Sequence, residues 1–211
     1  MIIVFARAPV PGRAKTRLIP RLGEWRAARL HESLTLHALR TARLADEVVE
    51  LHGTRRHGFF KRLGVPFRVQ RGKDLGERMH YALSRAKRPA ILIGTDCPML
   101  TPADLRRAAR WLRGGYDAVL APAQDGGYAL IALRHSKREF FKGIDWGGAH
   151  VYADTVERLA GYRWRALRQV WDVDRPEDLE RLRLLRFAST ARRASPRSLC
   201  TRARSGGSGR L

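Results

Sequence analysis

Asp96 is the side chain around which a reactive site is most simply built. An apolar run from Ala90 to Ile93 is typical of a buried strand, and it breaks at Gly94, two residues before this carboxylate. Open α/β sheets bind ligands beyond the carboxyl ends of their strands. A carboxylate there could hold a divalent metal over the phosphates of a nucleotide. The alternative interpretation is that Asp96 caps the helix expected from Pro102.

A cationic loop follows the first apolar strand, residues 2–6. Prolines and a glycine exclude a regular helix or strand there, although the spacing is not that of a Walker A motif. Lys and Arg side chains bind phosphate oxygens directly. We therefore expect this loop to bind phosphate through Pro11, Gly12, Arg13, Lys15 and Arg17. The loop also contains Arg7.

Two further acidic segments could contribute to the same site. Asp125, Gly126 and Gly127 stand between two apolar strands, where they form either a hairpin turn or a loop that lets backbone approach a ligand. Asp172 and Asp174 precede a helix expected from Pro176. If the sheet is parallel, all of these segments lie along the same carboxyl edge as Asp96.

Other polar residues have simpler structural explanations. Asp74 and Glu77 fit a capping box, which leaves Arg78 free to face a ligand. The seven histidines show no metal-like spacing, and we expect His31, His37 and His80 at the surface. No Ser/His/Asp pattern suggests a covalent mechanism.

Strands and helices alternate along the chain, which predicts an α/β fold, Rossmann-like and three-layered, with a mostly parallel sheet. The expected strands are 2–6, 47–51, 66–70, 90–93, 116–121, 129–133 and part of 162–170. The expected helices are 22–44, 55–63, 72–86, 102–112, 136–142, 149–159 and 176–187. The predicted domain is 1–187, and residues 188–211, rich in Arg, Ser and Gly, are expected to form a disordered basic tail.

The formal net charge of +22, from 42 Lys+Arg against 20 Asp+Glu, favours anionic partners: phosphorylated substrates, nucleic acid or an acidic membrane surface. A solvated basic surface is the simplest alternative. No run is long enough for a membrane span, and no signal peptide is expected. Cys97 and Cys200 stand far apart, so the reducing cytoplasm is the expected location.

The order of five motifs resembles the DUF2064 group of bacterial proteins, transferases of the glycosyltransferase-A type, including those associated with radical-SAM and selenium domains. They are related to nucleotidyltransferases that make molybdenum-cofactor and F420 precursors. The resemblance covers residues 2–187. The motifs are residues 7–18, 74–79, 94–98, 125–128 and 172–179. One departure is Trp146-Gly147-Gly148, where the family usually has Trp-Ser-Thr, and the missing hydroxyl puts acceptor handling in doubt.

The resemblance implies a site for a nucleotide-sugar or nucleoside-triphosphate donor, an unknown small-molecule acceptor, and Mg²⁺ or Mn²⁺. Asp96 would be the main metal ligand and Asp172 the second, with Asp174 as its rival. Asp96 and Asp125 would be catalytic, Asp125 as base for an alcohol acceptor. The acceptor or sugar would contact Gly126, Gly127, Tyr128 and Trp146.

Three functions remain open from the sequence. The first is a metal-dependent glycosyltransferase that uses a sugar nucleotide. The second is a nucleotidyltransferase that joins an NTP to a phosphorylated acceptor and releases pyrophosphate, which the cationic loop favours. The third is a basic nucleic-acid-binding or scaffold protein with reduced catalysis. Because aromatic residues fall mostly in core-like strands, nucleic acid is not expected as a partner beyond a weak contact by the tail.

Overall fold

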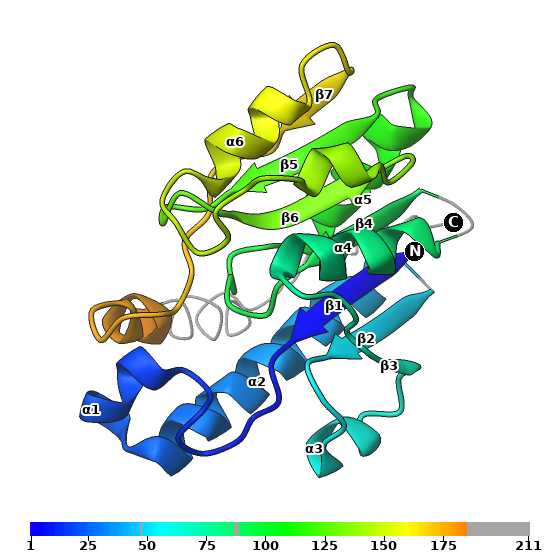
Figure 1. Ribbon diagram of the computed structural model, residues 1–211. Helices are drawn as coiled ribbons and strands as arrows, with labels where there is room; N and C mark the ends of the chain where they lie inside the picture. The colour runs from blue at the N-terminus through cyan, green and yellow to red at the C-terminus, as the bar shows by residue number, and fades with distance from the viewer. Residues whose placement is uncertain (47, 87–88, 185–211) are drawn as a thin grey trace, which may run out of the picture.

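The computed structural model describes residues 1–46, 48–86 and 89–184. Its strands form one sheet in the order β3-β2-β1-β4-β6-β5-β7 (Figure 1). Only β6 runs antiparallel to its neighbours. The mostly parallel α/β fold predicted from the sequence is confirmed. The strands are β1 (Ile2–Ala6), β2 (Val49–Gly53), β3 (Phe67–Val69), β4 (Ala90–Ile93), β5 (Ala118–Pro122), β6 (Tyr128–Leu133) and β7 (Trp164–Ala166).

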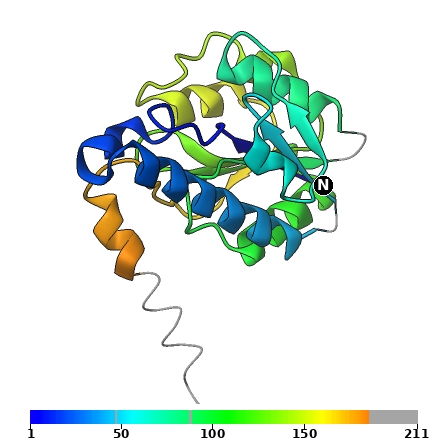
Figure 2. The same cartoon turned by 90° about the horizontal axis from the view of Figure 1, so that it is seen from below.

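Helices cover both faces of the sheet. One face carries α2 (Glu24–Arg43) and α5 (Pro102–Arg113), and the other carries α4 (Leu75–Ser84), η2 (Arg138–Phe141) and α6 (Val151–Arg158) (Figures 1 and 2). Shorter elements are η1 (Thr16–Leu18), α1 (Ile19–Leu22) and α3 (Gly58–Lys61). The chain is helical again over 178–184, where the structure's described part ends.

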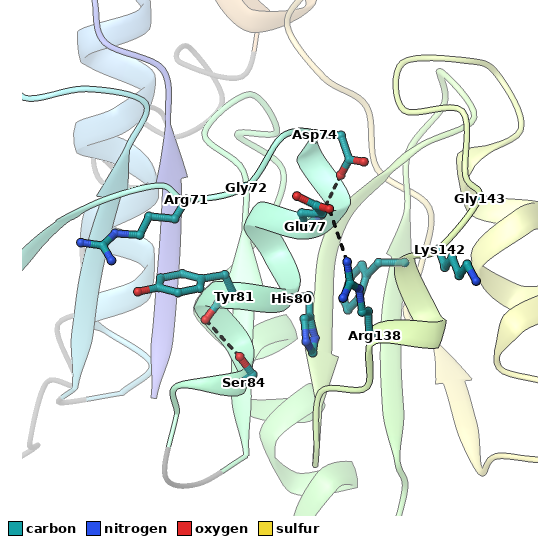
Figure 3. Close-up of a pocket in the computed structure, with 11 residues that line it drawn as sticks. Arg71, Gly72, Asp74, Glu77, His80, Tyr81, Ser84, Arg138, Lys142 and Gly143 are labelled. Carbon is teal, nitrogen blue, oxygen red and sulfur yellow. Dashed lines mark hydrogen bonds and ion pairs between the residues drawn. The ribbon is translucent and has the colours of Figure 1, made fainter.

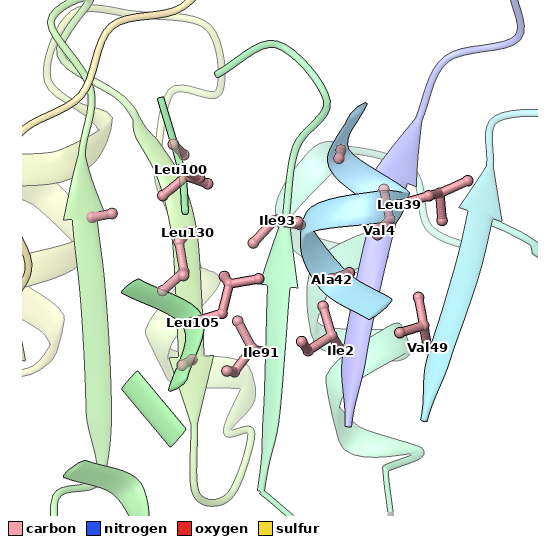
Figure 4. Close-up of a cluster of buried hydrophobic side chains, with 14 of the residues drawn as sticks. Ile2, Val4, Leu39, Ala42, Val49, Ile91, Ile93, Leu100, Leu105 and Leu130 are labelled. Atoms are coloured by element: carbon pink, nitrogen blue, oxygen red, sulfur yellow. The ribbon is translucent and has the colours of Figure 1, made fainter. Parts of the chain in front are cut away.

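The core has two halves because successive strand residues point to opposite faces of the sheet. Ile2 and Val4 of β1 pack on the side of α2 and α5, together with Leu39 and Leu105 (Figure 4). Ile3 and Phe5 pack with α4 and η2 on the other side. Burial of both faces explains why the central strands are continuous apolar runs.

Local signals in the sequence set several element ends. Thr101 and Asp104 form a complete capping box at the start of α5. The interpretation of Asp96 as the cap of this helix is therefore wrong. At α4, Asp74 accepts from the Glu77 amide as predicted, but Glu77 accepts from the amide of Lys73 instead of that of Asp74.

Other predictions needed correction in their extent. The helix expected over 136–142 is the short 3-10 turn η2, and the helix expected over 55–63 is the single turn α3. The segment at Asp125 is a hairpin turn, because β5 and β6 pair antiparallel. No helix within the described ranges is both long and apolar enough to cross a membrane. The tail predicted for 188–211 lies outside the described residues.

Candidate functional site

A cavity of about 490 Å³ opens at the carboxyl edge of the sheet. It brings together three predicted acidic residues, Asp96, Asp125 and Asp172, that are far apart in the sequence. Arg17, Gly127, Tyr128 and Trp146 also line it, as predicted for a common site. Its remaining walls include residues that the sequence did not single out: Phe5, Leu75, Met79, Leu92, Cys97, Val151 and Arg175.

Residues 170–173, which follow β7, are held at this edge of the sheet by backbone hydrogen bonds. We call them the last segment. The Val173 amide donates to the Asp96 carbonyl at 2.8 Å, and Val173 is fully buried. Three residues earlier in the segment, the Val170 carbonyl accepts from the Gln124 amide at 3.0 Å. These bonds hold Asp172 beside the loop that follows β4 and the turn that follows β5.

Lys15 lies at the centre of the predicted phosphate loop, but its side chain is only 3% exposed. Its ammonium is 2.8 Å from Asp96 Oδ1 and also donates to the Val173 carbonyl. Lys15 is the one non-glycine residue with positive φ in the described ranges, at 51°, a conformation that costs energy outside glycine. The geometry therefore makes Lys15 a residue that positions Asp96 and the last segment.

His31 is buried against Asp96, so its prediction as a surface residue is wrong. Its Nε2 lies 2.9 Å from the Arg7 carbonyl, which can only accept, so Nε2 carries the proton. Its Nδ1 is 3.8 Å from Asp96 Oδ1 and has no hydrogen-bond partner among the described residues. Burial lowers the pKa of His31 despite the opposing effect of Asp96. Spacing alone could not reveal this contact, since His31 belongs to the inner face of α2.

The carboxylates of the cavity differ in electrostatic environment. For Asp96, desolvation acts to raise the pKa, but Lys15, His31 and hydrogen bonds outweigh it and the pKa is lowered. For Asp172, burial and the charges of Asp125 and Asp174 raise the pKa. Burial, followed by the charges of Asp96, Asp172 and Asp125, raises the pKa of Cys97 well above its usual value. The cavity thus contains negative charge that lacks full compensation.

A smaller cavity of about 290 Å³ adjoins Asp96 on the side of the cationic loop. It is lined by Arg7, Lys15, Thr16, Arg17, His31, Asp96 and Asp174. The Arg17 guanidinium binds the Asp174 carboxylate. Arg17 is one of the predicted phosphate ligands. It lines both cavities and therefore lies where they meet.

The turn at Asp125 is shaped by its glycines. Gly126 has φ of 89°, and a Cβ built on it would overlap the carbonyl of Ala149. The Gly126 carbonyl also accepts from the Tyr152 amide at 2.8 Å. Gly126 therefore packs the turn against the segment around Ala149 and Tyr152. The Gly127 amide donates to Asp125 Oδ1 at 2.9 Å.

Trp146 also lines the cavity and packs against α4. A Cβ on Gly76 would lie 2.5 Å from the Trp146 ring, so this close packing requires glycine. Gly147, where the expected family pattern has Ser, has φ of 109° and no atom within 4 Å of a Cβ built on it.

Residues 35–148 match the family described as an uncharacterized protein conserved in bacteria, DUF2064. The chain belongs to this family. A solved structure from Desulfovibrio desulfuricans G20, which bears the provisional name nucleotide-diphospho-sugar transferase, is 34% identical. It aligns over 92% of this chain and 90% of its own, with a TM-score of 0.83.

More distant relatives of this DUF2064 protein include one that is named a guanylyltransferase. The 2-phospho-L-lactate guanylyltransferase of Methanocaldococcus infernus is 22% identical over 129 residues, 57% of this chain. The match spans 56% of that relative's length. The molybdopterin-guanine dinucleotide biosynthesis protein A of Archaeoglobus fulgidus shares the fold at 15% identity, with a TM-score of 0.57 over 89% of this chain and 100% of its own. These matches confirm the expected family, the fold class and the general assignment to transferases.

Some residues predicted for the site lie outside the two cavities of the DUF2064 protein. Pro11, Gly12, Arg13 and Gly126 line neither. Arg78, which we expected to face the ligand, donates to the Gly72 carbonyl at 3.1 Å. Asp174 lines only the smaller cavity, where it is bound to Arg17.

A larger cavity of about 640 Å³ lies along the outer side of α4 (Figure 3). Its two carboxylates are already engaged. Asp74 caps α4, and Glu77 accepts from the Lys73 amide and lies 3.6 Å from Arg138. It contains none of the three acidic residues gathered at the sheet edge, so size alone does not make it the candidate site.

The carboxylate oxygens of Asp96, Asp125 and Asp172 in the DUF2064 protein fit a hard divalent cation. Such a cation would be coordinated partly by the protein and partly by a substrate. In the described ranges no group of three or more His, Cys, Asp or Glu side chains could hold a metal by itself. Mg²⁺ is commonly bound by one or two carboxylates together with substrate phosphates and water. The raised pKa of Asp172 beside Asp125 is the mark of carboxylates that a cation would stabilise.

Proposed function

We propose that this chain is a metal-dependent transferase that moves a glycosyl group from a nucleotide sugar to a hydroxyl acceptor. The observation that carries the proposal is the common cavity of Asp96, Asp125 and Asp172 at the carboxyl edge of the sheet. This is where open α/β sheets bind their ligands. The provisional name of the relative from D. desulfuricans supports a sugar nucleotide as donor.

Asp96 and Asp172 would hold Mg²⁺ or Mn²⁺, with Asp174 as the rival second ligand. Once bound, the cation would stabilise negative charge on the diphosphate leaving group. Lys15 keeps Asp96 ionised and oriented, as its 2.8 Å contact indicates. Arg17 is placed to contact the diphosphate, because it lines both cavities.

In the reaction, an acceptor hydroxyl forms a bond to the anomeric carbon while the bond from that carbon to the diphosphate oxygen breaks. Asp125 would accept the hydroxyl proton. The Gly127 amide fixes Asp125 by donating to its Oδ1. Trp146 and Tyr128 would contact the acceptor or the sugar, since both line the same cavity.

The charge of the cavity favours a neutral acceptor over a phosphorylated one. Burial raises the pKa of Asp172, and the charge of Asp125 adds to this effect. Asp125 is not among the proposed cation ligands, so its charge would repel an acceptor phosphate. Burial also raises the pKa of Tyr128, so its phenol stays neutral. A hydroxyl-bearing acceptor meets carboxylates and aromatic rings without this cost.

Nucleotidyl transfer from an NTP to a phosphorylated acceptor is the second candidate. Two observations favour it: the similarity to a guanylyltransferase, and the cavity lined by Arg7, Lys15 and Arg17. In that reaction the acceptor phosphate attacks the α-phosphorus and pyrophosphate leaves. No base is needed, so Asp125 would be dispensable.

Donor binding and product release test the proposal. UDP- and GDP-sugars and the NTPs are compared by thermal shift, with and without Mn²⁺. We expect a metal-dependent rise with a sugar nucleotide that is lost in Asp96→Asn but retained in the exposed control Glu180→Gln. A screen of acceptors should then release a nucleoside diphosphate. Release of pyrophosphate would select the second candidate, and no shift with any nucleotide would overturn both.

A further inference from the structure

The outer surface of α2 and α5 is strongly cationic. Each helix contributes four arginines, and all eight are exposed: Arg26, Arg29, Arg40, Arg43, Arg106, Arg107, Arg110 and Arg113. The two helices contain three acidic residues, Glu24, Glu32 and Asp104. Asp104 is buried and lies 3.0 Å from Arg168, so it offers no charge to this surface. We call this the α2–α5 face.

The helices on the opposite side of the sheet are balanced in charge. Together α4, η2 and α6 contain three arginines, Arg78, Arg138 and Arg158, against four acidic residues, Glu77, Glu139, Asp154 and Glu157. Arg138 and Arg158 lie within 4 Å of carboxylates there. Among these helices the excess of positive charge therefore lies on one face, and a general arginine-rich composition does not explain that asymmetry.

Large apolar side chains interrupt the arginines on this face. Trp25 is 75% exposed, Leu36 is 50% exposed, and Leu44, which ends α2, is 62% exposed. Successive spacings of four, seven and four residues place Trp25, Arg29, Leu36 and Arg40 along one stripe of the helix. Figure 2 shows the length of α2 along the outside of the molecule.

The two helices form one continuous surface. Arg106 of α5 donates to the Leu44 carbonyl at the end of α2, at 2.8 Å. Arg43 of α2 donates to the Leu63 and Gly64 carbonyls. The remaining arginines of this surface make no ion pair with any residue in the described ranges, so their charge is available to a partner.

We propose that the α2–α5 face binds an anionic membrane surface. Arginines beside exposed Trp and Leu side chains match a surface with anionic headgroups above an apolar layer. Nucleic acid would offer phosphates, and the exposed Trp25 could stack on a base, but it offers no apolar layer for Leu36 and Leu44. The other rings near this face, Trp111 and Tyr116, are covered by Arg165 at 5.2 and 4.8 Å. The proposal is independent of the reaction at Asp96.

Vesicle co-sedimentation of the full chain tests this surface. The probes are vesicles of phosphatidylcholine alone and of equal parts phosphatidylcholine and phosphatidylglycerol. We expect binding only to the anionic vesicles. The combined variant Arg40→Gln, Arg107→Gln, Arg110→Gln and Arg113→Gln should weaken it by at least about tenfold. The matched control removes four cations elsewhere: Arg55→Gln, Arg56→Gln, Lys61→Gln and Arg62→Gln.

A second pair of variants separates membrane binding from simple charge attraction. Trp25→Ser with Leu36→Ser keeps every charge, and it should weaken binding to anionic vesicles and abolish a blue shift in tryptophan emission. Equal weakening by the control variant would overturn the proposal, because binding would then follow net charge alone. Unchanged vesicle binding by the combined arginine variant of the α2–α5 face would also overturn the proposal. So would a result in which this variant binds vesicles normally but has lost binding to a single-stranded oligonucleotide.

Discussion

At the scale of single residues, Lys15 joins three segments through one ammonium group. It contacts the Asp96 carboxylate at 2.8 Å and the Val173 carbonyl from a side chain that is almost fully buried. Lys15→Met should therefore lower the free energy of unfolding by about 1–2 kcal/mol, a range reduced because Asp96 is 46% exposed. Urea denaturation of metal-free protein measures this loss.

A double-mutant cycle with Asp96→Asn assigns the loss of stability from Lys15→Met to the ion pair. If Lys15 acts on Asp96, the two substitutions together should cost less than the sum of their separate effects. Additive effects would mean that Lys15 stabilises the fold only through Val173.

Residue types and order in the sequence were enough to predict that Asp96, Asp125 and Asp172 lie together at one edge of the sheet, where they line one cavity. Each follows or precedes an apolar strand, and parallel strands carry such residues to one edge. The contacts of His31 and Arg78 could not be predicted in this way. His31 turns inward because it belongs to the buried side of α2, and Arg78 is bound by the loop before α4.

At the scale of elements, the turn between β5 and β6 depends on Gly126. Gly126→Ala should reduce stability by about 2–4 kcal/mol, because φ is positive and the added Cβ meets the Ala149 carbonyl. Thermal denaturation measures the effect. Gly23→Ala is the matched control, since Gly23 has φ of 75° but open space around a Cβ; it should cost only the backbone strain, about 1–2 kcal/mol. Equal losses would show that backbone strain alone matters.

The capping box of α5 predicts a pH dependence. The burial of Asp104 acts to raise its pKa, but hydrogen bonds from Thr101 and the charge of Arg168 outweigh it, so the folded-state pKa is lowered. A lowered folded pKa contributes stability above the unfolded value, about 4, and this is lost as pH falls through the folded value.

Asp104→Asn should therefore cost about 1–2 kcal/mol at pH 7, and less at about pH 3. Urea denaturation over this range measures the difference from the natural protein. A difference that stays constant with pH would contradict the predicted role of the carboxylate charge.

Element types followed from apolar periodicity and capping residues, whereas the pairing of β6 did not. The sequence segment 125–127 was compatible with a hairpin or with a ligand loop. Antiparallel pairing with β4 as well as β5 places β6 inside the sheet, and this depends on contacts between distant segments. The short α3 and η2 also differ from their predicted lengths, and a glycine with positive φ follows each of them, Gly64 and Gly143.

At the scale of the whole molecule, net charge opposes folding. A formal charge of +22 produces repulsion within the compact state that salt screens. The melting temperature should therefore rise by a few degrees between about 0.05 M and about 0.5 M KCl. Differential scanning calorimetry measures it, and a constant or falling melting temperature would contradict the prediction.

The distribution of that charge makes the salt effect depend on where cations are removed. Like charges on the α2–α5 face lie on adjacent helices joined by Arg106, with few acidic residues between them. Removing Arg40, Arg107, Arg110 and Arg113 should flatten the salt dependence more than removing Arg55, Arg56, Lys61 and Arg62. If both variants flatten it equally, repulsion follows total charge, and concentration of charge on one face has no effect on stability.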